Sequence, residues 1–410
     1  MILGLLQVVL LRTSELKNSV LTENSLFIWQ TNNAIFIVRV MARFMMERIK
    51  EEDVVRQFNV VPLEEEELPE AMFSLFLRQL CELIVETPLA APTYSLLTEA
   101  TKLLTVLLSS PLFCPPGKPS HQLSAWKEVM QGGASVMAVP LTSTLLIRFM
   151  ERQAAPPRNE GGSLVLGLAS GMWNLLTLGY GGGGGGGGNE DGGDGGDAPL
   201  ADISLTLLLL LVNHCTDASA IENPYSEALA NFSNSADRSD PPAAALFQVE
   251  VPILYSSLAA TLHTDEATLL LYLLLHKNKG FHNYVLAATD IDRLVIPILQ
   301  SLYRAPSCSN HHIYMSLIIL LILSEDDLFN ETVHSCILRP AQVSWYTERG
   351  VSELSLGGLL ILVVIRTIQY NMLKMRDKYA PFSRSYEFMV LLQVLAHKLP
   401  CCPCQHELAV

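Results

Sequence analysis

The sequence predicts an all-α protein, arranged as an irregular α-solenoid of HEAT or armadillo type. Three observations support this fold class. Apolar residues recur at helical spacing along most of the 410-residue chain, short polar turns separate the resulting helices, and strand-like alternation is lacking. No clean repeat of about 40–47 residues is visible, so the solenoid prediction depends on the pairing of helices alone.

Two helices in the first part of the chain show the pattern. The segment Glu70–Glu86 carries an apolar stripe made of Phe73, Phe76, Leu77, Leu80 and Ile84. The segment Thr93–Ser109 repeats the design, with its leucines inward and with Glu99 and Lys102 predicted to face solvent. Such stripes would promote aggregation if they were exposed, so we expect the helices to stack and share a core.

The region after residue 260 gives a second pair of helices. Thr264 is a capping residue, Asp265 and Glu266 suit a first helical turn, and the apolar run Ala267–His276 follows. Asn278-Lys-Gly280 predicts the end of this helix. The next stripe consists of Ile291, Leu294, Val295, Ile298, Leu299 and Leu302, with a kink predicted at Pro297.

The two longest uncharged apolar runs, Ile313–Leu323 and Leu354–Ile365, decide between water and lipid as the surroundings of the helices. A membrane-spanning helix needs about 20 residues, and runs of about 10–14 are more typical of buried core helices. Lengthening either run would place charged residues in hydrocarbon. We therefore expect Ile313–Leu323 to lie sandwiched between neighbouring helices. An integral membrane protein that uses these two runs is the alternative.

Ser324 is predicted to cap a further helix that starts at the acids Glu325, Asp326 and Asp327. The stretch from Thr216 to Pro242 is rich in loop-forming residues. The apolar start, Met1–Leu11, lacks the basic region and cleavage site of a signal peptide, so a helix is the better prediction.

Composition changes in the middle of the chain suggest four parts. Residues 1–151 form an N-terminal helical array, and residues 152–200 a Gly/Pro-rich acidic linker with a short apolar segment. Residues 201–379 form a C-terminal helical array, and residues 380–410 a divergent tail. The apolar segment, Ser163–Gly179, has two interpretations: a helix docked on the core, or a segment that enters a membrane interface or a partner's groove.

Charge and cysteine content exclude several classes of protein. The net charge of −14 argues against nucleic-acid binding, which needs a surplus of Lys and Arg on one face. Eight cysteines are few for this length, and five of them are isolated, which suits reduced thiols of a cytosolic protein better than a disulfide framework. The five are Cys81, Cys114, Cys215, Cys308 and Cys336. Two glycosylation sequons, at Asn231 and Asn330, are predicted to be chance matches, because no leader delivers the chain to a secretory lumen.

Motifs that carry enzyme chemistry are weak throughout. Gly181–Gly188 satisfies a dinucleotide-binding pattern only because it is all glycine, and Gly167–Gly171 has its serine one position late for a nucleophile elbow. We predict no catalytic residues, no cofactor and no small-molecule substrate. A hydrolase or metal enzyme that uses His311, His312 or Cys401 is the alternative.

Two clusters of cysteine, histidine and aspartate residues are candidate metal sites. Cys401-Cys-Pro-Cys404 followed by His406 lacks a second pair of ligands, and palmitoylation there is an equally weak interpretation. His311 and His312 would need Asp326 and Asp327 brought close by the fold. We predict instead that the histidines and the acids are polar ends of helices. Farther along, Arg366, Gln369, Asn371 and Arg376 are predicted to mark where the last buried helix emerges into water.

Several blocks together resemble the dymeclin family over most of residues 1–379. They are Leu26–Ile37, Gly167–Gly171 with Thr177–Gly179, Ala267–His276, His311–Asp327, and the stretch from Trp345–Arg349 through Ile365–Met372 to Arg376–Tyr379. The resemblance implies a non-enzymatic cytoplasmic protein, peripheral on the cytosolic face of the Golgi, that is needed for Golgi organisation and vesicle traffic. It also implies Golgi-associated protein partners and a role in skeletal and brain development.

One feature of the family is not matched. Dymeclins begin with Met-Gly and are regarded as N-myristoylated there, whereas Met1-Ile-Leu-Gly4 aligns within the first helices of the family. We therefore expect no lipid site at this position. Beyond Tyr379 the resemblance ends, and the partner-binding residues of the array cannot be named from the sequence.

Overall fold

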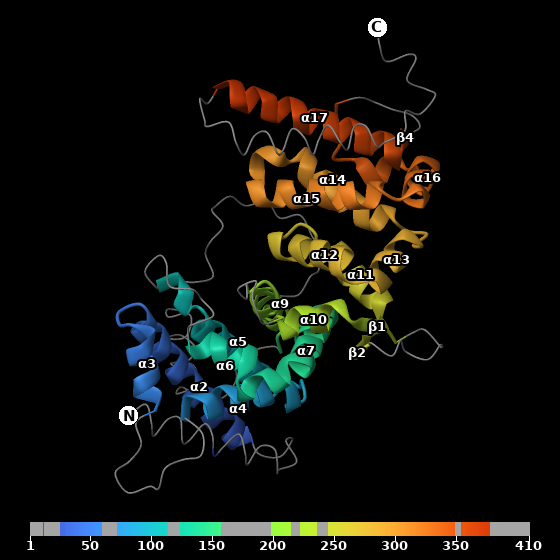
Figure 1. The fold of residues 1–410 in the computed structure, drawn as a ribbon. Coiled ribbons are helices and arrows are strands. Elements are labelled where there is room, and N and C mark those ends of the chain that lie inside the picture. The colour runs from blue at the N-terminus through green and yellow to red at the C-terminus, as the bar shows by residue number, and fades with distance from the viewer. Residues whose placement is uncertain are drawn as a thin grey trace, which may run out of the picture.

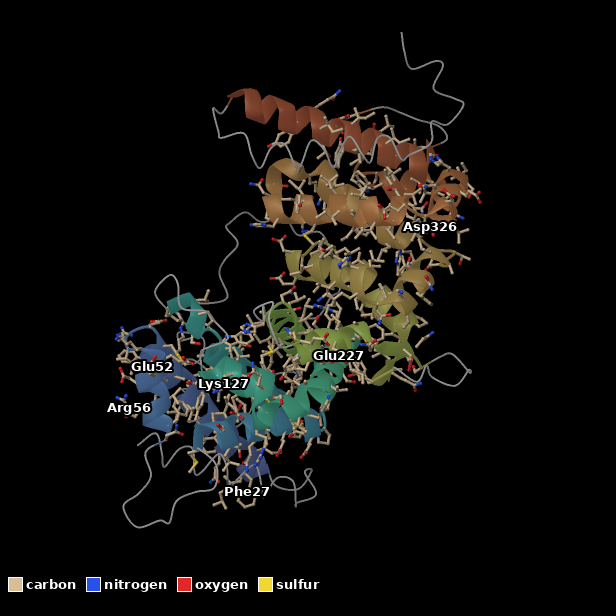
Figure 2. The ribbon with its side chains drawn as sticks, in the orientation of Figure 1. Phe27, Glu52, Arg56, Lys127, Glu227 and Asp326 are labelled. Atoms are coloured by element: carbon tan, nitrogen blue, oxygen red, sulfur yellow. The ribbon has the colours of Figure 1, made fainter. Side chains whose placement is uncertain are left out.

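The computed structural model describes residue 11 and residues 25–59, 72–113, 124–156, 198–214, 222–235, 245–348 and 354–377. These residues are mostly helical, and the short strands among them form two isolated pairs (Figure 1). The all-α prediction is confirmed, and the solenoid arrangement stays a prediction. Side chains fill the spaces between successive helices, from α3, where Glu52 and Arg56 are labelled, to the neighbourhood of Asp326 (Figure 2).

The first part of the chain packs around α5. Its elements are α2 (Ser25–Met46), α3 (Glu51–Phe58), α4 (Met72–Glu86), α5 (Tyr94–Leu108), α6 (Ser124–Gln131) and α7 (Ala138–Glu151), with 3-10 turns η1 (Ser110–Phe113) and η3 (Gly133–Met137). Helix α5 contacts α2, α4 and α9. The predicted helices Glu70–Glu86 and Thr93–Ser109 are confirmed as α4 and α5, and their apolar stripes are buried.

The second part stacks further helices in chain order toward the C-terminal end of the described residues (Figure 1). Its helices are α9 (Pro199–Val212), α10 (Pro224–Ala230), α11 (Val251–Thr261), α12 (Asp265–Lys277), α13 (Lys279–Leu286), α14 (Asp292–Tyr303), α15 (Asn310–Ser324), α16 (Asp327–Ser335) and α17 (Leu356–Asp377), with 3-10 turns η4 (Ala305–Ser307) and η5 (Pro340–Val343). Helix α12 packs on α15, and α14 packs on α15 and α17.

Two short strand pairs were not anticipated. Strand β1 (Phe232–Asn234) pairs in parallel with β2 (Phe247–Val249), in the register Phe232 to Phe247. Strand β3 (Ile337–Leu338) pairs antiparallel with β4 (Leu354–Ser355). Strands this short carry no readable alternation, so sequence periodicity does not detect them.

Three local predictions need correction. Glu99 does not face solvent: its side chain is 2% exposed, because Arg39 of α2 covers it. Ser324 is the last residue of α15 and not the cap of α16, which Asp326 caps. The loop-rich stretch Thr216–Pro242 contains α10 and β1, and the signal that was overlooked is Asn223-Pro224, an N-cap residue followed by proline at the first helical position.

One buried cluster extends through both parts of the chain, from Ile28 on α2 to Val364 on α17. Helix α7 connects the parts, because it contacts α4 on one side and α9, α10 and α11 on the other. The run Ile313–Leu323 lies within α15 and is largely covered by α12, α14 and α16, although Tyr314 is exposed.

One helical stretch within the described residues, Gly133–Glu151, is long and apolar enough to cross a membrane by length and composition. Half of its most apolar 18-residue window is buried inside the protein. The runs named from the sequence belong to the shorter apolar helices Asn310–Ser324 and Leu356–Tyr370.

Candidate functional site at the junction of the helical arrays

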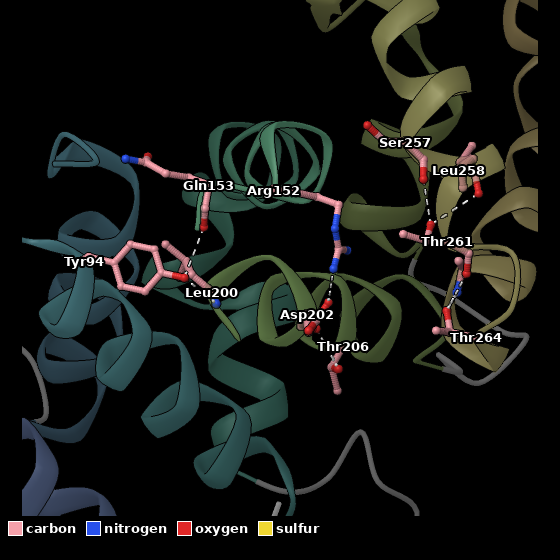
Figure 3. Close-up of polar contacts among 11 residues, drawn as sticks. Tyr94, Arg152, Gln153, Leu200, Asp202, Thr206, Ser257, Leu258, Thr261 and Thr264 are labelled. Carbon is pink, nitrogen blue, oxygen red and sulfur yellow. Dashed lines mark hydrogen bonds and ion pairs between the residues drawn. The ribbon is translucent and has the colours of Figure 1, made fainter. Parts of the chain in front are cut away.

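The C-terminal end of α7 and the N-terminal end of α9 meet beside α5 and α11 (Figure 3). These two ends flank residues 157–197, which lie outside the described residues. The predicted linker 152–200 and its apolar segment Ser163–Gly179 fall mostly in this gap, so their properties stay predictions. The junction is the candidate site because it sets the relative placement of the two arrays.

Tyr94 holds both ends at one point. Its hydroxyl donates to the carbonyl of Gln153 and accepts from the backbone N–H of Leu200, each across 3.3 Å. The first N–H groups of a helix have no partner within it, and Leu200 is the second residue of α9. Tyr94 is buried, so the hydroxyl replaces water at this helix end. Gln153 and Leu200 therefore lie at neighbouring positions, on either side of Tyr94.

A second set of contacts fixes the end of α7. Arg152 caps α7 in the left-handed conformation, with φ of 42°, and its Nη2 lies 3.1 Å from Oδ1 of Asp202 on α9. A non-glycine residue in this conformation costs roughly 1–2 kcal/mol. The hydroxyl of Ser257 on α11 donates to the carbonyl of Met150 across 2.8 Å. Polar contacts thus connect α7 to α9 and to α11 at the C-terminal end of α7.

A buried cation, Arg148, lies in the last turn of α7. Arg148 of α7 is 5% exposed, and its Nη2 donates across 2.5 Å to the carbonyl of Ile84 in the last turn of α4. Burial lowers the pKa of Arg148 to about 10, although Glu151 partly opposes the shift. Its Nη1 has no hydrogen-bond partner among the described residues. This guanidinium thus satisfies a carbonyl at the end of α4.

The thiols near the core are not activated. Burial raises the pKa of Cys81 to about 12, and Glu82 adds to the shift. Burial also raises the pKa of Cys308 and of Cys336. A nucleophilic cysteine needs a lowered pKa, so these three thiols stay protonated near neutral pH. Cys401, Cys402 and Cys404, with His406, lie outside the described residues.

The four residues considered for a metal are not brought together. His311 and His312 stand in the first turn of α15, whereas Asp326 and Asp327 follow its other end, about 20 Å away by helix rise. His312 lies with Nδ1 2.9 Å from Oδ1 of Asp265 on α12. Within the described ranges, no group of three or more His, Cys, Asp or Glu could hold a metal ion.

Asp265 is predicted only as a first-turn acid of α12, and in the structure its carboxylate also contacts the first turn of α15. Its Oδ2 also accepts a hydrogen bond from Ser309, the residue that caps α15. The N-terminal ends of α12 and α15 therefore lie side by side. Nothing in the local sequence identifies His312 as its partner, because the two residues are 47 positions apart.

Arg366, Asn330 and Asn231, which the sequence also singles out, make hydrogen bonds within the fold. Arg366 of α17 bonds the carboxylate of Glu348 and the carbonyl of Tyr303, and lies 3.8 Å from the centre of the Tyr303 ring. It therefore ties α17 to α14 as the helix approaches solvent. Asn330 is buried and donates to the carbonyl of Ser324, which leaves its amide inaccessible to glycosylation. The amide of Asn231 donates to the carbonyl of Glu227.

The comparisons with known proteins agree on one family. The family model "Dymeclin: Dyggve-Melchior-Clausen syndrome protein" matches residues 3–382. The dymeclin of Mus musculus is 42% identical over 397 residues, covering 92% of this chain and 57% of its own length. The dymeclin of Drosophila melanogaster is 38% identical over 425 residues, with 92% and 58% covered. The chain thus spans a little over half of the relatives it matches, and no solved structure matches it.

Proposed function

The chain belongs to the dymeclin family, and from this premise we propose that it is a non-enzymatic, helical protein-binding scaffold that supports Golgi organisation and vesicle traffic. In this proposal it is cytoplasmic and peripheral on the cytosolic face of the Golgi, and its partners are Golgi-associated proteins. A role of the family in skeletal and brain development follows from the same resemblance.

One observation carries the proposal: a single apolar core connects α2 to α17. An array with a continuous core holds its outer surface in a fixed shape over a long distance. Stacked helices of this kind bind partners along extended faces, and the binding energy comes from many side chains rather than from one pocket. The family match covers nearly the whole of this array.

The junction supports a scaffold in a second way. Tyr94, Arg152 and Ser257 fix the end of α7 against α9 and α11. The described residues on either side of residues 157–197 are held close together, because Gln153 and Leu200 both bond the hydroxyl of Tyr94. In the proposal, these contacts keep the helices on each side of the junction in a fixed relative placement, so that partners meet a surface of constant shape.

The alternative function is that of an integral membrane protein, and α7 is the helix that favours it. Together with the preceding turn η3 it forms the apolar stretch Gly133–Glu151, which has the length of a span. Against it, Leu141, Leu145 and Phe149 are fully buried against other helices, and Arg148 would face hydrocarbon at a cost of several kcal/mol. A helix that fills a protein core is therefore the better account of this stretch.

Alkaline carbonate extraction of cell membranes separates the two functions. A peripheral scaffold is released into the supernatant, and an integral protein stays in the pellet. The chain is then expressed in cells depleted of their dymeclin, and Golgi compactness and the transit time of a secreted cargo are measured. Rescue by the parent chain supports the proposal, whereas a chain that is well folded yet gives no rescue contradicts it.

Matched variants test the non-enzymatic part. His311→Ala and Cys401→Ser remove the side chains that a hydrolase or metal enzyme would use, and we expect rescue equal to that of the parent. Tyr94→Phe loosens the junction, and we expect weaker rescue and weaker co-purification of Golgi proteins. Loss of rescue in His311→Ala at an unchanged melting temperature would favour an enzyme.

A further inference from the structure

Lys277, in the last turn of α12, has different surroundings from the other lysines whose side chains the structure describes. It is partly buried, and its Nζ donates across 2.5 Å to the hydroxyl of Ser226 in the first turn of α10. The other described lysines are either exposed or paired with a carboxylate: Lys50, Lys102, Lys127 and Lys279. Among these side chains, Lys277 alone is partly removed from water and bonded to a neutral group.

The first turn of α10 suits an amine better than an ammonium ion. An ammonium group has three N–H donors, and the hydroxyl of Ser226 is one neutral acceptor. The first turn of a helix otherwise presents backbone N–H groups, which are donors themselves. Those of Tyr225 and Ser226 bond the side chain of Asn223, and that of Glu227 bonds its carbonyl. The hydroxyl of Ser226 is thus the acceptor that this turn offers to Lys277.

Neighbouring charges do not replace the lost water around Lys277. The titratable side chains beside this end of α12 are Glu222, Glu227, His276, Lys279 and His282, of which Glu227 is labelled in Figure 2. Neither acid forms an ion pair with Nζ in the described part of the chain. The last turn of a helix favours a cation, but the side chain of Lys277 reaches across to α10. Burial lowers the pKa of Lys277 below its ordinary value, in agreement with this geometry.

A partly buried amine of this kind is a nucleophile, and a thioester is a suitable electrophile for it. The lone pair of Nζ attacks the carbonyl carbon, an N–C bond forms and the C–S bond breaks. The thiol leaves, and the proton lost by nitrogen balances the charge on sulfur. Nothing is oxidised or reduced. An aldehyde would instead give a reversible imine, which needs a separate reductant to become a lasting product.

The product of acyl transfer fits the same surroundings. The amide nitrogen keeps one N–H, which can still donate to the hydroxyl of Ser226. Because Lys277 has no carboxylate partner among the described residues, the loss of its charge leaves no buried anion behind. Lys102 differs, since its modification would remove a cation beside the buried carboxylate of Glu99. The fold therefore tolerates acylation at Lys277.

We propose that Lys277 is a site of acylation by acyl thioesters, where the partly buried amine reacts beside the hydroxyl of Ser226. The site is separate from the junction at Tyr94, and the proposal does not depend on the Golgi role or the scaffold function. Its consequence is that the end of α12, next to α10, loses one positive charge when the chain is acylated.

Incubation of the full chain with acetyl-coenzyme A tests the proposal. Acetylation of each lysine is followed by mass spectrometry between pH 7 and pH 9, and Lys279 is the internal control because it is exposed and two residues away. We expect Lys277 to react about threefold faster than Lys279 at pH 7.5, because the neutral amine is the reacting form. The rate at Lys277 should also rise at lower pH than the rate at Lys279.

Ser226→Asp and Ser226→Ala are the matched variants. Aspartate suits the first turn of a helix, and its carboxylate beside Nζ favours the ammonium form of Lys277. We expect Ser226→Asp to slow acetylation of Lys277 about tenfold and to leave Lys279 unchanged. Ser226→Ala removes the acceptor without adding charge, so Lys277 should react at least as fast as in the parent chain.

Three results would overturn the proposal. They are coincident pH profiles for Lys277 and Lys279, a slower rate at Lys277 throughout the pH range, and equal Lys277 rates in Ser226→Asp and Ser226→Ala. The pH profiles need no variant, so they decide the matter even if Ser226→Asp fails to fold. Circular dichroism of both variants shows whether their rates can be compared with those of the parent.

Discussion

The two parts of the molecule satisfy their helix ends in different ways. In the first part, groups far away along the chain provide the partners. Glu51 accepts from the N–H of Ala125 at the start of α6, and Tyr94 accepts from Leu200 at the start of α9. The indole of Trp126 donates to the carbonyl of Leu108 at the end of α5, as Arg148 does to Ile84 of α4.

From α12 onward, most helices begin with a side-chain cap of their own. Thr264 caps α12, Asn278 caps α13, Ser309 caps α15 and Asp326 caps α16, each by accepting from an N–H two or three residues ahead. In contrast, α3, α5 and α7 of the first part have no side-chain hydrogen bond from their N-cap residue within the described part of the chain. In the second part, α9, α11 and α14 also lack one, and α9 is completed by Tyr94 of the first part.

The two kinds of helix differ in where the hydrogen-bond partners of their terminal backbone groups come from. A locally capped helix has its first-turn N–H groups satisfied by its own sequence, so it gains stability before its neighbours are in place. A helix capped from 60 or 100 residues away is completed only when the layers have assembled. We therefore expect substitutions in the first part to affect several helices together, and cap substitutions in the second part to act locally.

The largest effect is expected at Glu99. Its buried carboxylate accepts from Arg39 of α2 across 2.8 Å and lies 3.1 Å from Nζ of Lys102. Glu99→Ala would leave the largely buried guanidinium of Arg39 without its partner, which costs about 3–5 kcal/mol. Urea unfolding should show this loss as a lower midpoint.

The control for Glu99 is Glu47→Ala, which removes the carboxylate of an exposed pair with Arg43. Exposed pairs contribute about 0–1 kcal/mol, so little change is expected. The double variant Arg39→Met with Glu99→Leu replaces the buried pair by apolar groups and should recover most of the stability. Equal effects of Glu99→Ala and Glu47→Ala would show that α2 does not depend on the buried pair.

The next effect is expected at the junction. Tyr94→Phe keeps the ring but leaves the N–H of Leu200 without its acceptor, which costs about 1–3 kcal/mol. Tyr303→Phe is the matched control, because that hydroxyl bonds Thr347 at an exposed position. Amide exchange should accelerate at the start of α9 in Tyr94→Phe alone. An unchanged exchange rate there would mean that the hydroxyl does not hold the two chain ends.

Alkaline pH should weaken the first part through Cys81. Its pKa rises from 9.0 to about 12 in the folded protein, so the unfolded chain loses this proton first. The contribution is therefore fully present below pH 9 and is lost as pH rises through the window from 9 to 12. At pH 10 the loss is on the order of 1 kcal/mol relative to pH 8.

Comparison of variants isolates the contribution of the Cys81 site, which includes the smaller part that Cys81 plays in raising the pKa of Tyr225. Urea midpoints at pH 8 and pH 10 should differ less in Cys81→Ala than in the parent chain. Cys308→Ala serves as the control, since Cys308 is only partly buried. A parent-like pH dependence in Cys81→Ala would contradict the buried thiol as the source.

The helices that sequence reasoning located best are those with local signals. Thr264 as a cap, Asn278 as a stop, and the stripe from Ile291 to Leu302 are confirmed because each depends on residues within one or two turns. Helix α10 had a local signal as well, in Asn223-Pro224. The burial of Glu99 had none, since its cause is Arg39, 60 residues earlier.

The same limit applies to the candidate site. Tyr94, Arg152, Asp202 and Ser257 come from four separate segments, and none belongs to a recognisable motif. Their contacts follow from the packing of α7 against α9 and α11, which apolar periodicity predicts only as burial and not as a choice of neighbour. The family resemblance, by contrast, was visible because it depends on ordered blocks and needs no contact information.

The smallest effect is expected at the local caps. The hydroxyl of Thr264 accepts from the N–H of Ala267 across 3.3 Å, and its loss in Thr264→Ala costs about 1 kcal/mol. Thr264→Ser keeps the hydroxyl and should stay close to the parent. Because the cap serves one helix, amide exchange should accelerate in the first turn of α12 and remain unchanged in α4 and α5. Faster exchange in α5 after Thr264→Ala would show that the caps of the second part also stabilise the first, and the contrast between local and remote capping would then fail.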